Sequence, residues 1–195
     1  MKSLFRRLVF VSTLFVGSTT LIGCASVTMP PPTANANNVE KLRMANLTPT
    51  AVGKFSLATG VRQDVDNSLG GLRGSSVRAP SGSFSQQLKD VIVTDLKAAG
   101  LYDDRSQIQI GAQLTDSQVD AAISGPGTAK LAAIFTVDKA GQRTFEKALF
   151  VDSQWDSSFV GAIAIPEAIN QYTALYKALA AKLFDDNEFR AALAK

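Results

Sequence analysis

The chain has 195 residues, among them 20 basic residues, 17 acidic residues, one cysteine and no histidine. The absence of histidine excludes a Ser-His-Asp or Cys-His nucleophile system, a histidine general base and a histidine-containing zinc site. A single cysteine excludes a disulfide within the chain. We therefore expect a protein that is not an enzyme and that holds no metal and no other cofactor.

The first 24 residues follow the order of an export signal. A basic start precedes a mostly apolar run at residues 8–22, and Gly23 supplies the small residue that comes before a cleavage site. A membrane-spanning helix needs ~20 predominantly apolar residues, whereas this run is shorter and is diluted by serine and threonine. An ordinary secretory signal would leave Cys24 as an unpaired thiol in an oxidising compartment. Both alternatives are less favourable than a modified Cys24.

The stretch Leu21-Ile22-Gly23-Cys24 resembles the bacterial lipobox, the processing site of lipoproteins. The resemblance implies cleavage before Cys24, a thioether-linked diacylglycerol on its sulfur and a fatty acid such as palmitate on the new amino group. We therefore predict a signal peptide at residues 1–23 and attachment to a membrane through a lipid anchor on Cys24. An Asp directly after the cysteine retains lipoproteins at the inner membrane. The residue here is Ala25, which implies the outer membrane, with the protein facing the periplasm.

Loss of the signal peptide changes the charge of the chain. It removes three basic residues, Lys2, Arg6 and Arg7, and no acidic residue, which leaves 17 of each sign. The formal charge of the processed chain is thus zero, and no basic cluster with interleaved aromatic side chains stands out in it. We therefore expect no nucleic acid among its partners.

The segment after the cysteine has the composition of a linker. Residues 25–38 lack a hydrophobic period and are rich in proline and asparagine. Proline-rich chain is extended, with ~3.1 Å per residue. We predict a lipidated Cys24 and a tether over residues 24–39, followed by a single domain over residues 40–195.

The first half of this domain contains one helix and weaker strand candidates. Residues 51–57 favour a strand, and a second strand near 72–77 lies within a polar loop. Ser83 begins a helix as its N-cap, with Gln86 completing a capping-box pair and Gly100 in the position of the C-terminal stop. Apolar residues between them recur with helical spacing, so one face of the helix must be buried.

Three strands are predicted next. Residues 107–114 alternate between polar and apolar side chains, which is the pattern of a half-buried strand. Residues 131–137 and 144–151 flank a loop of turn-forming residues at 138–142. This arrangement predicts a β-hairpin.

The last long helix is predicted to begin at Pro166, because the N–H that proline lacks would be unpaired in the first helical turn in any case. Apolar residues continue with helical spacing to Leu183, and residues 187–193 are predicted to add a short terminal helix. Strands and helices do not alternate regularly in this order. The predicted fold class is therefore α+β, a mostly antiparallel sheet with two amphipathic helices packed on one face.

Few residues are candidates for a chemical site. The acidic pairs Asp103-Asp104 and Asp185-Asp186 lie in predicted helix-end loops. Turn chemistry explains them better than general acid–base catalysis does.

The connection before the last helix is more apolar than most connections. It contains the four large apolar residues Phe159, Val160, Ile163 and Ile165. Two alternatives are open for this possible docking loop. The side chains tuck beneath the helix and close the core, or part of the segment is exposed and docks on a membrane or a protein.

The predicted segments are, in chain order, a lipobox, a proline-rich segment, a helix ending at Ala99-Gly100, an alternating strand, a hairpin and a long terminal helix followed by Asn187-Glu188-Phe189-Arg190. In this order the chain resembles the small YajG-like outer-membrane lipoproteins. That resemblance implies a periplasm-facing binding or assembly module of the cell envelope, whose partner is an unidentified envelope protein or lipid. The chain is more loosely similar to the auxiliary lipoproteins of ABC-type transport, which implies an auxiliary subunit of an envelope lipid or glycan transport system. A deep apolar cavity would favour transport, and a filled core with an exposed sheet edge would favour protein binding.

Overall fold

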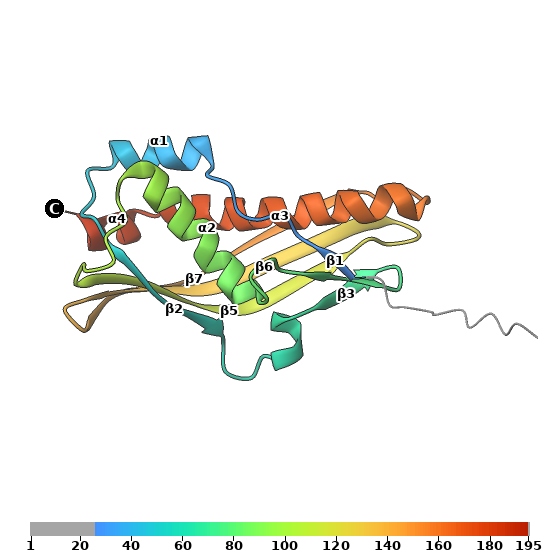
Figure 1. Cartoon of the computed structure of the whole chain (residues 1–195), viewed down its shortest axis with the longest axis horizontal. Coiled ribbons are helices and arrows are strands. Elements are labelled where there is room, and N and C mark those ends of the chain that lie inside the picture. The colour runs from blue at the N-terminus through green and yellow to red at the C-terminus, as the bar shows by residue number, and fades with distance from the viewer. Residues whose placement is uncertain (1–25, 195) are drawn as a thin grey trace, which may run out of the picture.

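The computed structural model describes residues 26–194. The predicted signal peptide at residues 1–23 and the predicted lipidation site Cys24 lie outside the described residues. The fold is α+β, as predicted (Figure 1). Its elements in chain order are β1 (Ser26–Thr28), α1 (Ala36–Met44), β2 (Ala51–Leu57), the short 3-10 helix η1 (Gln63–Asp66), β3 (Leu69–Leu72), β4 (Ser75–Arg78), α2 (Phe84–Ala99), β5 (Ile108–Asp120), β6 (Pro126–Lys139), β7 (Gln142–Asp156), α3 (Gly161–Asp185) and α4 (Asn187–Leu193).

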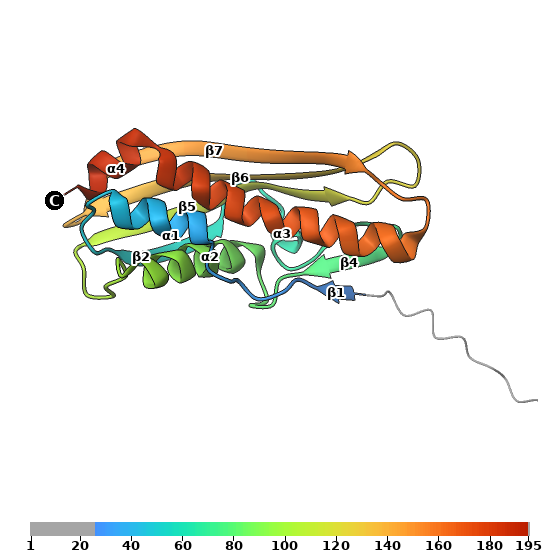
Figure 2. The same cartoon turned by 90° about the horizontal axis from the view of Figure 1, so that it is seen from above.

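Four strands form the main sheet, in the order β2-β5-β6-β7. β5, β6 and β7 are antiparallel neighbours, whereas β2 runs parallel to β5 because the chain crosses over through α2 between them. α2 and α3 pack against one face of this sheet, and α1 packs on both helices (Figures 1 and 2). The prediction of two amphipathic helices on one face of a mostly antiparallel sheet is therefore confirmed.

The predicted hairpin is present and is longer than its sequence pattern indicated. Its strands extend over β6 and β7, and they are joined at Ala140 and Gly141, whose φ angles are 50° and 82°. Two consecutive residues with positive φ are what a type I′ turn requires, and the twist of this turn matches that of the flanking strands. The predicted strand at 107–114 likewise extends as β5 to Asp120.

The helix predicted after Ser83 is confirmed as α2. The Ser83 hydroxyl accepts a hydrogen bond from the backbone N–H of Gln86 at 3.1 Å, and Gly100 ends the helix with a φ of 77°. A left-handed residue at this position costs glycine nothing and lets its N–H bond back to the last turn. Leu88, Ile92 and other apolar residues of one face are completely buried.

The predicted tether is wrong for residues 26–38, because this segment is part of the folded domain. β1 pairs in parallel with β4, and the N–H of Met29 donates to the carbonyl of Arg78 at 2.9 Å while its side chain is buried. The asparagines are also ordered, because the Asn35 carboxamide caps the start of α1. Asparagine is favoured both in linkers and at helix N-caps, so composition alone did not separate the two roles.

The predicted start of the last helix at Pro166 is also wrong, because α3 begins at Gly161. The carbonyl of Val160 accepts hydrogen bonds from the N–H groups of Ile163 and Ala164, both at 3.0 Å, and so forms a helical turn ahead of the proline. The bias of a residue before proline toward extended geometry is a preference. Here the added turn overcomes it, at the cost of the one intrahelical bond that Pro166 cannot donate.

The short terminal helix is confirmed as α4, and its cap explains one of the predicted acidic pairs. The Asp186 carboxylate accepts hydrogen bonds from the N–H groups of Glu188 and Phe189, and Lys147 Nζ lies 2.9 Å from it. Burial acts to raise the pKa of Asp186, but the hydrogen bonds from Lys147 and from the backbone outweigh burial and hold the pKa below its usual value. Asp185 pairs with Lys41 at 2.6 Å.

The core lies between the inner face of the main sheet and the two helices α2 and α3. It includes a small polar cluster, in which the Tyr172 hydroxyl lies 2.5 Å from Ser117 Oγ and 2.9 Å from the Tyr176 hydroxyl. Burial raises the pKa of both tyrosines, so both stay protonated and their hydroxyls satisfy one another. The largest fully buried side chains are Tyr172, Tyr176, Phe84, Phe135, Phe184, Phe189, Met29, Leu42, Leu72, Leu88, Ile92 and Leu96.

Candidate binding surfaces

The face of the main sheet opposite α2 and α3 carries mostly polar and small side chains. They alternate with the core residues along each strand and line up across the strands, because the antiparallel register places Gln113, Ile134 and Ala148 in one row and Gly111 and Thr136 in the next. This face was visible in the sequence only as polar residues between apolar ones. We refer to it below as the open face.

The open face is hollowed where β2 meets β5 and β6. The hollow has a volume of about 450 Å³. It exists because two facing positions have no side chain: a Cβ at Gly111 would lie 2.9 Å from Thr136 Oγ1, and a Cβ at Gly53 would lie 3.4 Å from Gln109 Oε1. Glycine at these positions keeps the floor of the hollow at the level of the backbone.

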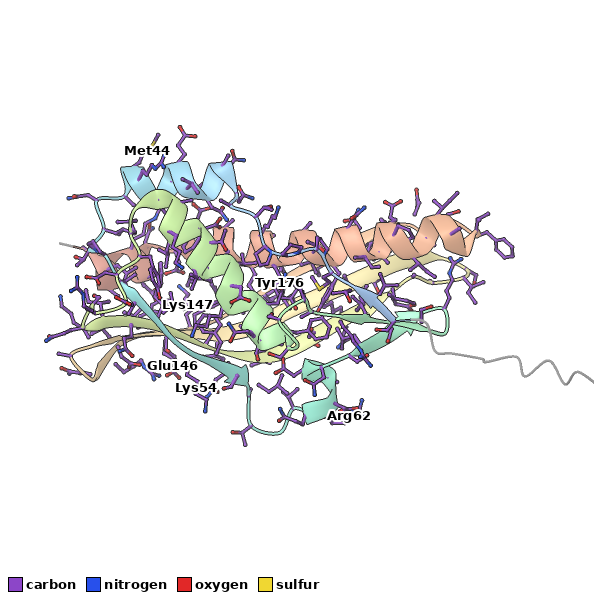
Figure 3. All side chains as sticks on the ribbon, in the orientation of Figure 1. Met44, Lys54, Arg62, Glu146, Lys147 and Tyr176 are labelled. Carbon is purple, nitrogen blue, oxygen red and sulfur yellow. The ribbon has the colours of Figure 1, made fainter. Side chains whose placement is uncertain are left out.

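The charges around this hollow balance one another. Arg143 hydrogen-bonds Asp138 at 2.7 Å and also pairs with Glu146, and the bond to Asp138 is the main reason why the pKa of Arg143 is raised. Lys54 projects from the same side of the sheet (Figure 3). With two cations and two anions at its rim, the hollow does not favour a strongly charged ligand of either sign.

A second hollow, of about 390 Å³, lies farther along the open face beside Phe150. Phe150 is 63% exposed, which is high for a phenylalanine in a strand. Lys182 from α3 reaches around the edge of the sheet, where its Nζ donates to the Phe150 carbonyl at 2.9 Å and lies 4.6 Å from the ring centroid. The ring is thereby held in place as a partly apolar feature of the open face.

β7 forms one edge of the main sheet. It has 15 residues and pairs with β6 on one side only, as far as the described part of the chain shows. The hydrogen bond from Lys182 to the Phe150 carbonyl removes one backbone acceptor from this edge. Most side chains of β7 that face away from the core are charged or polar. Both features limit unwanted pairing at a sheet edge. The edge next to Phe150 is nevertheless long enough for strand addition by another chain.

A different surface lies where the β3–β4 turn meets two other loops. The Arg73 guanidinium donates hydrogen bonds to the carbonyls of Ala121 and Ala122, in the β5–β6 loop, at 2.7 and 2.6 Å. It also donates to the carbonyls of Ser158 and Phe159, before α3, at 2.5 and 2.8 Å. One side chain thus joins two loops that are far apart in the sequence, which no local pattern indicated.

Large apolar side chains are exposed on both of these loops and on the first turn of α3. Phe159 is 80% exposed, Ile163 is 57% exposed and Ile123 of the β5–β6 loop is 61% exposed; Val160 is exposed as well. The alternative that the docking loop closes the core is therefore wrong for Phe159, Val160 and Ile163, because α3 begins early enough to lift them into solvent. Ile165 is half-buried and does pack against the core. We name Ile123, Phe159, Val160 and Ile163 the apolar end.

The other candidate residues have structural roles in the part of the chain that the structure describes. Asp103 accepts a hydrogen bond from the N–H of Arg105 at 3.0 Å, as turn chemistry predicts. Asp185 and Asp186 are engaged in the ion pairs and the cap described above. Residues 26–194 contain no group of three or more acidic or cysteine side chains placed to hold a metal ion.

None of the helices within residues 26–194 combines the length and the apolar character needed to cross a membrane.

The sequence matches no protein-family model and no curated protein. Solved structures are similar in fold. A protein of the family DUF330 from Xanthomonas campestris superposes with a TM-score of 0.55 at 12% identity, over 82% of this chain and 95% of that one. A minor lipoprotein from Acinetobacter baumannii gives a TM-score of 0.42 at 14% identity, over 74% of this chain and 92% of that one. The likeness to the first protein is one of fold. The resemblance to YajG-like lipoproteins stays a prediction.

Proposed function

We propose that this chain is a lipid-anchored lipoprotein of the bacterial outer membrane, facing the periplasm, which binds an envelope protein through the open face and the β7 edge. The observation that supports this most directly is the combination of a filled core with an exposed sheet face. Phe150, the hollow beside it and the hollow where β2 meets β5 and β6 supply contact points on that face. We expect no enzymatic activity, no cofactor and no nucleic-acid partner.

The alternative is an auxiliary lipoprotein subunit of an envelope lipid or glycan transport system. Such a subunit would need a place for an acyl chain or a sugar. The space between sheet and helices is instead occupied by side chains such as Phe135, Tyr172 and Tyr176, which are fully buried. The polar hollow of the open face has room for a glycan. The transport alternative therefore predicts glycan binding at the same surface at which the first proposal predicts protein binding.

Support for the anchor comes from the lipobox. We predict that Cys24→Ser abolishes labelling by a palmitate analogue, because serine has no thiol for the thioether on which processing depends. Labelling of cells that express the wild type or the variant, followed by mass determination of the mature protein, measures this. Equal labelling of the two would contradict the anchor.

Partner binding is tested on the open face. We expect Phe150→Arg and Ile134→Arg each to reduce capture of envelope proteins by the immobilised lipidated protein while leaving the melting temperature within a few degrees of wild type, because both side chains project from the sheet surface. Met44→Arg is the matched control, since Met44 is an exposed apolar residue on α1, away from the open face (Figure 3). Unchanged capture by both open-face variants would contradict the proposal, and capture of glycans or lipids in place of proteins would favour the transport alternative.

A further inference from the structure

We propose that the apolar end contacts the lipid bilayer that holds the anchor, with the side chains of Ile123, Phe159, Val160 and Ile163 facing the membrane surface. This inference rests on the proposed lipid anchor at Cys24. It goes beyond that anchor, because a lipidated cysteine on a long tether would allow the domain any orientation.

The length of chain available between the anchor and the domain is short. Only Ala25 separates Cys24 from Ser26, the first residue of β1. Two extended residues span at most ~7 Å between Cα atoms. The backbone of Ser26 therefore lies close to the bilayer surface whenever the acyl chains on Cys24 are inserted.

The position of Ser26 in the domain is set by strand pairing. Ser26 pairs with Ser76, and Thr28 pairs with Arg78, in the parallel ladder between β1 and β4. Met29 continues this attachment with a hydrogen bond to Arg78 and a buried side chain. β1 is thus held along its whole length, and the start of the strand cannot swing away from β4 without breaking these contacts.

Ser76 is the second residue of β4, just after the β3–β4 turn, whose Arg73 holds the two loops next to which the apolar residues lie. The start of β1 and the start of α3 accordingly lie at the same end of the molecule, opposite the C-terminus (Figures 1 and 2). A chain that is anchored two residues before Ser26 therefore brings the apolar end toward the same bilayer.

The chemistry of the apolar end suits the membrane interface. Three of its four side chains are aliphatic and one is aromatic, and the hydrogen bonds of Arg73 to separate backbone carbonyls hold both loops in fixed positions. The nearby charges do not form a basic patch, because the exposed Asp120 lines the same hollow as Arg73, the exposed Asp156 precedes Ser157, which Arg73 contacts, and the Arg73 guanidinium is engaged. Contact should therefore arise from apolar insertion and depend little on anionic lipid.

The experiment uses the absence of other thiols. Cys24 is the sole cysteine and its sulfur is occupied in the lipidated protein, so one introduced cysteine carries one label. An environment-sensitive fluorophore is attached to Ile163→Cys, to Ile123→Cys or to the control Met44→Cys in the full lipidated protein. Each protein is reconstituted into vesicles of phosphatidylethanolamine and phosphatidylglycerol, with or without brominated phospholipid as a quencher that acts only within the bilayer.

We expect brominated lipid to quench the labels at 163 and 123 several-fold more strongly than the label at 44, with the same ratio when phosphatidylglycerol is replaced by phosphatidylcholine. Equal and weak quenching at all three positions, in protein that floats with the vesicles, would overturn bilayer contact while leaving the anchor intact. Labels at 163 and 123 that respond only when envelope proteins are added would assign the end to a protein partner and would also overturn it. A mature protein whose mass lacks acyl chains and which does not float would overturn the anchor itself.

Discussion

Leu179→Asp should leave the domain largely unfolded at room temperature. Leu179 is completely buried on the face of α3 that packs against the main sheet. Its replacement loses ~1.5–3 kcal/mol of side-chain burial, and an unpaired carboxylate in the core adds several kcal/mol or forces local unfolding. Domains of this size hold about 5–15 kcal/mol of stability, so the combined loss removes most of it. Far-ultraviolet circular dichroism with thermal and urea melts measures the effect.

The neighbouring residue provides the control for this prediction. Ala178 is exposed on the same helix, so Ala178→Asp introduces the same charge and a somewhat larger loss of helix propensity, which costs only about 0.7 kcal/mol. A cooperative melt close to that of the wild type is expected for it. If Leu179→Asp also melted like the wild type, the assignment of the buried face of α3 would be wrong.

Gly71→Ala should destabilise the protein by about 3 kcal/mol or more, the sum of three separate costs. The φ of Gly71 is +90°, a conformation that alanine adopts at a cost. A Cβ at this position would lie 2.0 Å from the carbonyl oxygen of Val119, which belongs to backbone and cannot rotate away. The hairpin of β3 and β4 would have to move, which breaks the hydrogen bond from the N–H of Ala121 to the Gly71 carbonyl. Urea denaturation at constant temperature measures the loss.

Gly74→Ala measures the cost of the backbone conformation without the steric clash and the lost hydrogen bond. Gly74 lies in the same hairpin with a φ of +88°, and no atom lies within 4 Å of where its Cβ would be. It should therefore show only the backbone penalty of ~1–2 kcal/mol. Equal losses for the two variants would mean that β3 does not approach β5 as closely as the structure shows.

The parts of the fold that the sequence predicted well are those with a local physical cause. α2 is bounded by a side-chain cap at Ser83 and a left-handed glycine at Gly100, which act within a few residues of themselves. β5, β6 and β7 show their period of two because one face is buried and the other is open. These signals need no knowledge of distant parts of the chain.

The parts that the sequence did not predict depend on contacts between distant segments. β1 has only three residues, and nothing within them indicates that β4 will pair with them. The open-face hollow needs Gly53 and Gly111 to come together from different strands. The apolar end needs Arg73 to join two loops, so sequence analysis identified Phe159, Val160 and Ile163 but missed Ile123, whose loop lies far from them in the sequence.

The short pairing of β1 also determines how the domain would respond to a mechanical load on its N-terminus. A pull through the anchor acts first on the three paired residues of β1 and on Met29, which are the first contacts along the chain. After an exposed hydrogen bond from Lys177 to the Thr33 hydroxyl at 3.1 Å, the next attachment is at Asp95, which accepts hydrogen bonds from the N–H of Asn35 and the side-chain amide of Asn38, both at 2.8 Å. Detachment of β1 and Met29 alone would release residues 26–34, which span ~31 Å when extended. The domain could then move away from the bilayer by that distance while α1 and the main sheet stay folded.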